Sequence, residues 1–313
     1  IKGDRVPVKI ANLGTQVTRI DSPDGGISIF SLNSIRDMNI WRRVLDDDGA
    51  LVSEEKLSAT PRLEEYPALS NAGDRIAFVS DRSGTDEIWI MNNDGKDAYQ
   101  LTAFKGPVVI SGTWSPDDTK LGCHISLGQD QDIYFLNTTT GNATRLTFGG
   151  KHFVRRWSAD GRWLYFAKVH DGVSTLQKVN VASGEVVEVA ADGANAAAES
   201  LDGRYVYFVR ASSGGIWRAP TGGGQAELIA DSSVFSGISK SNFVENRNGI
   251  YLFDNARKSD EVVRYLDLST GAIRILSKNP IGAGFSFDVS PDGKQILSSR
   301  TDYLATEIVR IGR

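Results

Sequence analysis

The chain has 313 residues, of which 40% are hydrophobic and 24% are charged, and it carries a net charge of −4. This length is enough to bury a large core, no apolar run is long enough to cross a membrane, and the acidic balance argues against contact with nucleic acid. Cys123 is the single cysteine, so an internal disulfide and a cysteine-built zinc site are excluded, and we expect a small buried hydrophobe in a strand.

The chain opens with a strand-like segment, Arg5 to Ala11, that has no partner beside it in the sequence. A serine- and aspartate-rich turn then recurs along the chain, and each copy precedes an apolar strand. We call these segments the anchor turns. They begin at Ser22, Ser70, Ser115, Ser158, Ser200 and Ser290, with a degenerate copy at Glu245.

The anchor turns follow one another at spacings of 42 to 48 residues. A fixed period of about 40 to 45 residues with several strands in each copy is the signature of propeller blades. The copy from Glu64 to Thr102 shows the unit in full, with an inner strand, an anchor turn, a second strand, a third strand and an outer strand. Such a four-stranded sheet exposes two apolar faces and needs like neighbours on both sides.

The spacing predicts an all-β, seven-bladed propeller formed by the whole chain as a single domain, with six blades as the alternative. The predicted blades cover residues 17–60, 61–104, 105–149, 150–192, 193–233, 234–280, and 281–313 together with 5–11. In this prediction Arg5 to Ala11 becomes the outer strand of the last blade. It closes the ring and removes exposed sheet edges.

Three segments resemble a known family: IAFVSDRSGTDEIWIMNNDG, WSPDDTK and FDVSPDGKQIL are similar to the PD40, or TolB-like, WD40-type β-propeller repeat of bacteria. The resemblance implies the fold rather than one function, because such propellers serve as protein-binding modules, sensor domains, gates beside peptidases and, in a few cases, lyases. The usual members of this kind have six blades. The compartment stays open, and we favour the periplasm over the cytoplasm.

We expect a binding site at the mouth of the central channel, where chain segments lead into the inner strands. An acidic side, a basic side and aromatic residues would together orient a peptide or an anionic ligand there. The candidates are Glu64, Glu65, Tyr66, Lys151, His152, Arg155, Arg156, Phe235, Phe285 and Phe287. The alternative is that Glu64 and Arg155 pair with each other or with solvent, and that the phenylalanines pack between blades.

The three histidines, His124, His152 and His170, all lie toward the predicted mouth. Some propeller lyases that act on pectin fragments hold a divalent metal with histidines at this place, so the resemblance offers the three residues as an alternative metal site. The spacing alone does not support it. We expect no cofactor.

The function predicted from the sequence is a non-catalytic recognition or scaffold propeller that binds a protein, a peptide or a small ligand at the channel mouth. We expect it to be a module of a larger bacterial sensor, regulator or envelope protein, without nucleic-acid contact or membrane insertion. The alternatives are a metal-dependent lyase of the oligogalacturonate type and a gating domain of a peptidase.

Overall fold

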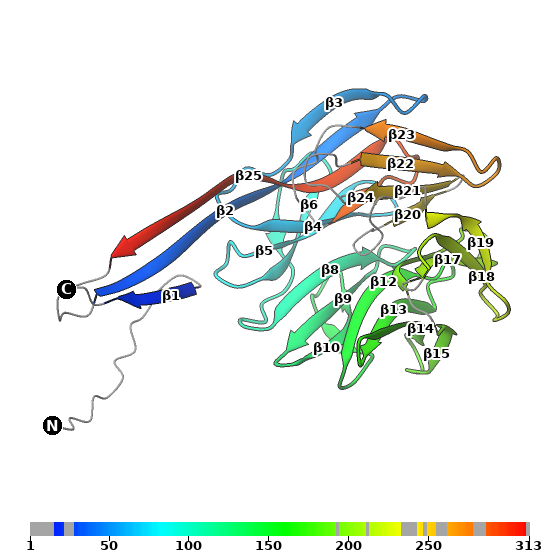
Figure 1. The fold of residues 1–313 in the computed structure, drawn as a ribbon, viewed down its shortest axis with the longest axis horizontal. Helices are drawn as coiled ribbons and strands as arrows, with labels where there is room; N and C mark the ends of the chain where they lie inside the picture. The colour runs from blue at the N-terminus through cyan, green and yellow to red at the C-terminus, as the bar shows by residue number, and fades with distance from the viewer. Residues whose placement is uncertain are drawn as a thin grey trace.

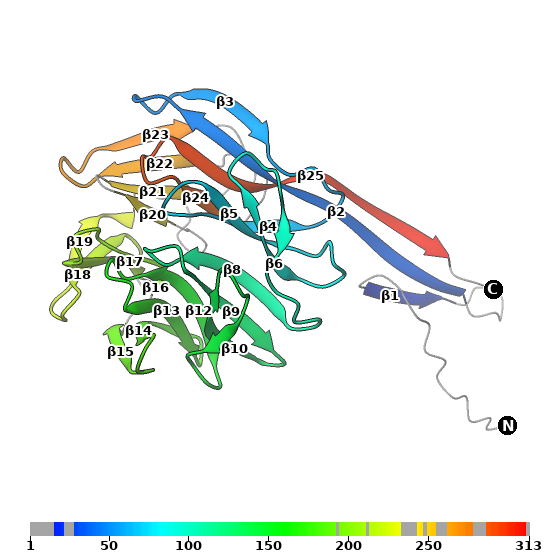
Figure 2. The same ribbon diagram turned by 180° about the vertical axis from the view of Figure 1, so that it is seen from behind.

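The computed structural model describes the following residues: 16–21, 28–191, 194–210, 213–232, 243–246, 249–254, 262–277 and 286–310. All the long elements of this part are β-strands, and it contains no α-helix that could cross a membrane. Figure 1 and Figure 2 show the sheets arranged around a common centre.

Five units are each built from four strands that are consecutive in the chain and pair antiparallel in order. The first consists of β4 (Glu64–Leu69), β5 (Arg75–Ser80), β6 (Glu87–Asn92) and β7 (Tyr99–Gln100). The second consists of β8 (Val108–Trp114), β9 (Lys120–Leu127), β10 (Asp130–Asn137) and β11 (Ala143–Arg145). The third consists of β12 (Lys151–Trp157), β13 (Trp163–His170), β14 (Val173–Asn180) and β15 (Val186–Ala190).

The fourth and fifth units repeat this plan. The fourth consists of β16 (Ala194–Glu199), β17 (Tyr205–Arg210), β18 (Ile216–Pro220) and β19 (Glu227–Ala230). The fifth consists of β20 (Phe243–Asn246), β21 (Gly249–Asp254), β22 (Val262–Asp267) and β23 (Ile273–Ser277). One parallel pair, Gln131 with Lys151, joins the second and third units into an eight-stranded sheet.

The sixth unit combines strands from both halves of the chain. From the inside outward it consists of β24 (Phe287–Val289), β25 (Gln295–Arg310), β2 (Ser28–Leu45) and β3 (Leu51–Lys56). β2 and β25 pair from Phe30 with Arg310 to Val44 with Gln295, and their far parts extend away from the ring as a ribbon (Figure 1). β1 (Gln16–Asp21) pairs with β2 on this ribbon.

This sheet changes the predicted blade count. The first and the last predicted blades, 17–60 and 281–313, share one sheet, so the count of seven is not confirmed. The described strands form six four-stranded units, which is the number given as the alternative. The predicted closing strand, Arg5 to Ala11, lies outside the described residues. One edge of β25, the last strand of the predicted seventh blade, pairs with β2.

The six inner strands contact one another in a circle, in the order β4, β8, β12, β16, β20, β24 and back to β4. Apolar side chains fill the space between neighbouring sheets. One such core cluster joins Ile88 and Ile90 of the first unit with Leu121 and Cys123 of the second. Cys123 is fully buried in β9, as predicted. Each sheet therefore has both apolar faces covered by its neighbours.

The anchor turns owe their recurrence to a repeated pair of hydrogen bonds. The hydroxyl of Ser158 donates to Asp160 at 2.7 Å and accepts the backbone N–H of Trp163 at 2.9 Å. The turns at Ser115, Ser200 and Ser290 contain the same two bonds. The serine thus holds the start of the second strand against the end of the inner strand.

Two tryptophans that precede anchor turns link neighbouring units. The indole N–H of Trp114 donates to the carbonyl of Ala68 at 2.9 Å, and that of Trp157 donates to the carbonyl of Thr113 at 2.8 Å. Both tryptophans are buried. Their role is therefore packing between blades, with the polar end of each ring satisfied by the preceding blade.

We predict that Ser158→Ala lowers the free energy of unfolding by about 1–3 kcal/mol, because Ser158 is 2% exposed and the substitution leaves the N–H of Trp163 without its acceptor. Denaturant unfolding measures the change. Ser83→Ala, at an exposed turn, is the control and should be close to neutral. Equal stability of Ser158→Ala and the wild type would contradict the role given to the anchor serines.

We also predict an acid-sensitive contribution from Asp117. The hydrogen bond from the Ser115 hydroxyl holds the pKa of Asp117 at about 2, below its ordinary value of 3.8. Because the folded pKa is depressed, the stabilisation is present above pH about 4 and is lost as the pH falls toward 2. The stability difference between wild type and Asp117→Asn should therefore shrink over this range in unfolding titrations, and a difference that stays constant down to pH about 2 would contradict the prediction.

Candidate functional site

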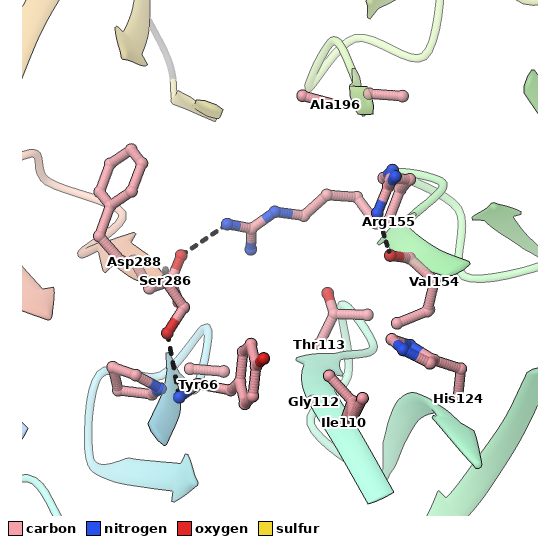
Figure 3. A pocket seen from close by; sticks show the side chains of 15 residues that line it. Tyr66, Ile110, Gly112, Thr113, His124, Val154, Arg155, Ala196, Ser286 and Asp288 are labelled. Carbon is pink, nitrogen blue, oxygen red and sulfur yellow. Dashed lines mark hydrogen bonds and ion pairs between the residues drawn. The ribbon is translucent and has the colours of Figure 1, made fainter. Parts of the chain in front are cut away.

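A cavity of about 150 Å³ lies where the inner strands meet (Figure 3). β4, β8, β12 and β16 line it, together with β24, the residue before β24 and one residue of β9. Five of the six units therefore contribute to one cavity. We call it the channel cavity.

β-Bulges position the side chains of the channel cavity. The register shifts on β4 between Glu65 and Ala68, on β8 between Ile110 and Thr113, and on β12 between Val154 and Trp157. β16 has a shift at the corresponding place. A bulge breaks the regular alternation of side chains and re-aims those inside it. Residues inside the bulges that line the cavity are Tyr66, Pro67, Gly112, Arg155, Arg156 and Ala196.

An ion pair crosses the channel cavity. A terminal nitrogen of Arg156 on β12 donates to Oδ1 of Asp288 on β24 at 2.6 Å, so the pair joins the third unit to the sixth. These two units lie opposite each other in the circle of six. Oδ2 of Asp288 accepts the backbone N–H of Leu69 at 2.8 Å, and Asp288 is 4% exposed. Both carboxylate oxygens are thus engaged.

The join between the sixth and first units has a second polar contact beside this pair. The backbone N–H of Tyr66 donates to the hydroxyl of Ser286 at 3.0 Å, as Figure 3 shows. Tyr66 adopts a φ of +56°, in the left-handed region that non-glycine residues rarely occupy. The hydroxyl of Ser286 also lies 3.3 Å from that of Ser299. The unusual backbone of Tyr66 is therefore held by the neighbouring unit.

Arg155 has a different environment from Arg156. Its Nη1 donates to the carbonyl of Val154 at 3.2 Å, while its Nε is buried without a hydrogen-bond partner. Among the described residues, no carboxylate forms an ion pair with Arg155. Burial lowers the pKa of Arg155 to about 10, so it remains a cation at neutral pH.

His124 on β9 reaches the same cavity and is 4% exposed. Its ring packs edge-on against Phe153 with the centroids 5.4 Å apart, and its Nδ1 has no hydrogen-bond partner in the described part of the chain. Burial and the positive charge of Arg155 lower the pKa of His124 to about 3. The imidazole is therefore neutral at physiological pH.

The structure brings four of the ten predicted site residues to the channel cavity. These are Tyr66, Arg155, Arg156 and Phe287. That they bind a ligand stays a prediction. Phe235 and Phe285 lie outside the described residues.

The remaining four predicted residues do not line the cavity. Glu64 is fully buried and forms an ion pair with Arg82 rather than with Arg155, and the Thr60 hydroxyl donates to it at 2.8 Å. Glu65 is half-buried on β4, and Lys151 is exposed at the start of β12. His152 is buried, with its Nδ1 3.1 Å from both Asp132 and Thr147.

The structure does not bring the three histidines together. His124 lines the channel cavity, His152 contacts Asp132 beside β10, and His170 lies at the exposed end of β13 with an 82% exposed side chain. The residues that the structure describes contain no group of three or more histidine, cysteine, aspartate or glutamate side chains suited to a metal ion.

Asp288, Thr113 and His124 also line the channel cavity and were not among the ten predicted residues, His124 having been predicted only as part of the alternative metal site. A signal for most of these positions does exist. Counting back two to five residues from an anchor serine reaches the end of the inner strand, where Asp288, Thr113 and Arg156 all stand two residues before their serines.

The profile of the TolB beta propeller domain, PD40, matches residues 34–235, which is more than half of the chain. This chain belongs to the TolB β-propeller family. An uncharacterized protein of Agrobacterium fabrum is 29% identical to it over 181 residues, which make up 54% of this chain and 61% of that relative. The chain spans less than two thirds of the length of the curated relatives it matches.

Solved structures share the TolB-type fold. A protein of Agrobacterium tumefaciens assigned as TolB matches with a TM-score of 0.69 at 19% identity, covering 86% of this chain and 99% of that one. TolB of Acinetobacter baumannii matches with a TM-score of 0.57 at 16% identity, covering 86% and 65%. Oligogalacturonate lyase in complex with manganese matches with a TM-score of 0.56 at 14% identity, covering 83% and 77%. At these identities the likeness shows the fold alone.

We predict that Asp288→Ala lowers the free energy of unfolding by about 2–3 kcal/mol, because it leaves Arg156 unpaired and the N–H of Leu69 without its acceptor. The cost stays below that of a fully buried pair, since the Arg156 side chain is 30% exposed. Asp288→Asn keeps an acceptor for Leu69 and should cost less. Denaturant unfolding of both variants checks this order, and the reverse order would contradict the role given to the pair.

Proposed function

We propose that this TolB-type propeller is a recognition module whose channel cavity binds an extended segment of a protein partner. The observation that carries the proposal is the cavity itself. Five units deliver side chains to it, four of them through a repeated bulge, and those side chains combine charged, aromatic and small residues. Concave sites with a few converging polar groups are where proteins bind ligands.

The chemistry of the cavity favours recognition of a polar chain. Tyr66 and Phe287 supply aromatic surface, and Arg155 supplies a charge that the fold leaves without a counterion among the described residues. Aromatic and arginine side chains are enriched where proteins bind partners. The described histidines lie apart, so they do not support the metal site on which the alternative of a metal-dependent lyase depends.

We also propose that the chain forms one propeller domain within a larger bacterial envelope, sensor or regulator protein. Two observations support this: the matched segment makes up only 24% of the Bacillus subtilis relative and 19% of a TolB homolog of Chlorobium chlorochromatii, and the family is that of TolB. The likeness to TolB favours a periplasmic over a cytoplasmic location. The alternative role within a larger protein is that of a gate beside a peptidase domain, because an uncharacterized peptidase of Bacillus subtilis is among the relatives.

The test is a binding screen with a library of fluorescently labelled, extended peptides read by fluorescence polarisation. We expect peptides to bind the wild type, and the double variant Arg155→Ala with Arg156→Ala to bind them about tenfold more weakly or worse, because charged hydrogen bonds are lost. The double variant Arg162→Ala with Arg204→Ala is the matched control, since both arginines lie at exposed anchor turns outside the cavity.

Full binding by the cavity variant, with its fold verified by circular dichroism, would refute the proposed site. Equal weakening by the control variant would show that only overall charge matters.

A further inference from the structure

We propose that the channel cavity is a carboxylate site in which the guanidinium of Arg155 and the imidazole of His124 hold the acid group. The inference rests on the proposed function in one respect, that the channel cavity is a binding site. It adds the chemical class of the group that the cavity accepts. The acid group can come from a free small acid or from an acidic peptide residue, and the experiment below distinguishes these sources.

One of the cations that line the cavity has no counterion among the lining residues. The charged side chains that line it are Arg155, Arg156 and Asp288. Arg156 and Asp288 form an ion pair at 2.6 Å, and the second oxygen of Asp288 is occupied by the N–H of Leu69. Arg155 therefore has no counterion within the described lining. A partly dehydrated cation without a counterion is costly, and an anion from outside removes that cost.

Two unsatisfied nitrogens mark the place of the acid group. Nε of Arg155 and Nδ1 of His124 are both buried, and neither has a hydrogen-bond partner among the described residues. Buried polar atoms without partners are rare in native proteins and call for an explanation. Both side chains line the channel cavity, and burial together with the charge of Arg155 lowers the pKa of His124.

A carboxylate matches these donors. It has two oxygens and accepts several hydrogen bonds, and the planar fork of a guanidinium fits it better than any other common group. A neutral imidazole adds a donor from whichever ring nitrogen carries the proton. Nη1 of Arg155 already donates to the carbonyl of Val154. Nε and the other terminal nitrogen are therefore left to bind the ligand.

The size of the cavity limits the ligand. At about 150 Å³ it is smaller than the 300–1,000 Å³ of usual small-molecule sites, so it accepts an acid group with few further atoms. Gly112 and Ala196 keep two of its walls small, and Tyr66 stands across from His124 (Figure 3). A short dicarboxylic acid or a single aspartate side chain fits this description.

The experiment uses isothermal titration calorimetry with two pairs of probes on the whole chain. Succinate is compared with its neutral diamide, succinamide, and an aspartate-containing heptapeptide is compared with the same peptide carrying asparagine. The proteins are wild type, Arg155→Gln, His124→Phe and the control Arg162→Gln, whose arginine is exposed at an anchor turn. We expect at least one acid to bind wild type and control alike, and Arg155→Gln to bind it about tenfold more weakly.

Each outcome decides the inference. Arg155-dependent binding of succinate assigns a free acid as the source, and binding of the aspartate peptide alone assigns a peptide. Equal affinity for the neutral partner of each pair, unchanged binding by Arg155→Gln, or no binding of either acid at millimolar concentration overturns the carboxylate site. Peptides that bind regardless of aspartate or asparagine refute the carboxylate site but not the recognition function, and succinate binding without any peptide binding does the reverse.

A second measurement separates a ligand role from a structural one. If Arg155 is kept for a ligand, its replacement by glutamine removes an unpaired cation, and the free Arg155→Gln protein should melt at a higher temperature than the wild type. Saturating acid should then raise the melting temperature of the wild type but not of the variant. A lower melting temperature of the free variant would assign Arg155 to the fold and overturn the inference.

Discussion

The structure depends on one constraint: a four-stranded sheet with two apolar faces must have a sheet on each side. A linear row of such sheets would leave two faces bare, whereas a circle leaves none. The circle of inner strands from β4 to β24 meets this constraint. The join between its last and first members needs its own contacts, and Asp288 and Ser286 provide them by accepting N–H groups of Leu69 and Tyr66.

The same closure creates the candidate site. Inner strands packed in a circle converge on a small central volume, and any residue that a bulge turns toward it must share that volume with residues from other units. The Arg156 and Asp288 pair uses part of it to connect opposite units. Arg155, one position earlier on the same bulge, contributes a charge that does not serve this connection. The residue that stabilises the ring, Arg156, and the residue proposed to bind a ligand, Arg155, are thus neighbours on one strand.

Local chemistry was readable from the sequence. The anchor turns could be predicted because Ser158 and its counterparts act on residues only two and five positions away. The blade count was not readable, because it depends on whether a distant segment pairs with β25. The spacing of the anchor turns is the same whether residues 17–60 form a separate blade or supply the outer strands of the last blade. In the structure they supply outer strands, because β2 pairs with β25.

Part of the lining of the channel cavity could be predicted from the sequence, while its role in binding stays a prediction. Tyr66, Arg155, Arg156 and Phe287 were named from their nearness to the inner strands, which is local information. Glu64 was misplaced because its partner, Arg82, lies on the loop after β5, and charge alone does not say which cation is nearest. Asp288 looked like an ordinary strand residue, since its partners on β12 and β4 are more than a hundred residues away.

The ribbon of β2 and β25 has a mechanical consequence. Ser28 and Arg310 lie at the same end of an antiparallel ladder, so a force that separates them would open the hydrogen bonds one pair after another, like a zipper, rather than shear them all at once. The ladder shifts register between Asp37 and Met38, and Asp302 beside this shift bonds to Asn39, Trp41 and Lys56. A pulling force on the ribbon would therefore have to break these side-chain contacts of Asp302 before it acts on the ring.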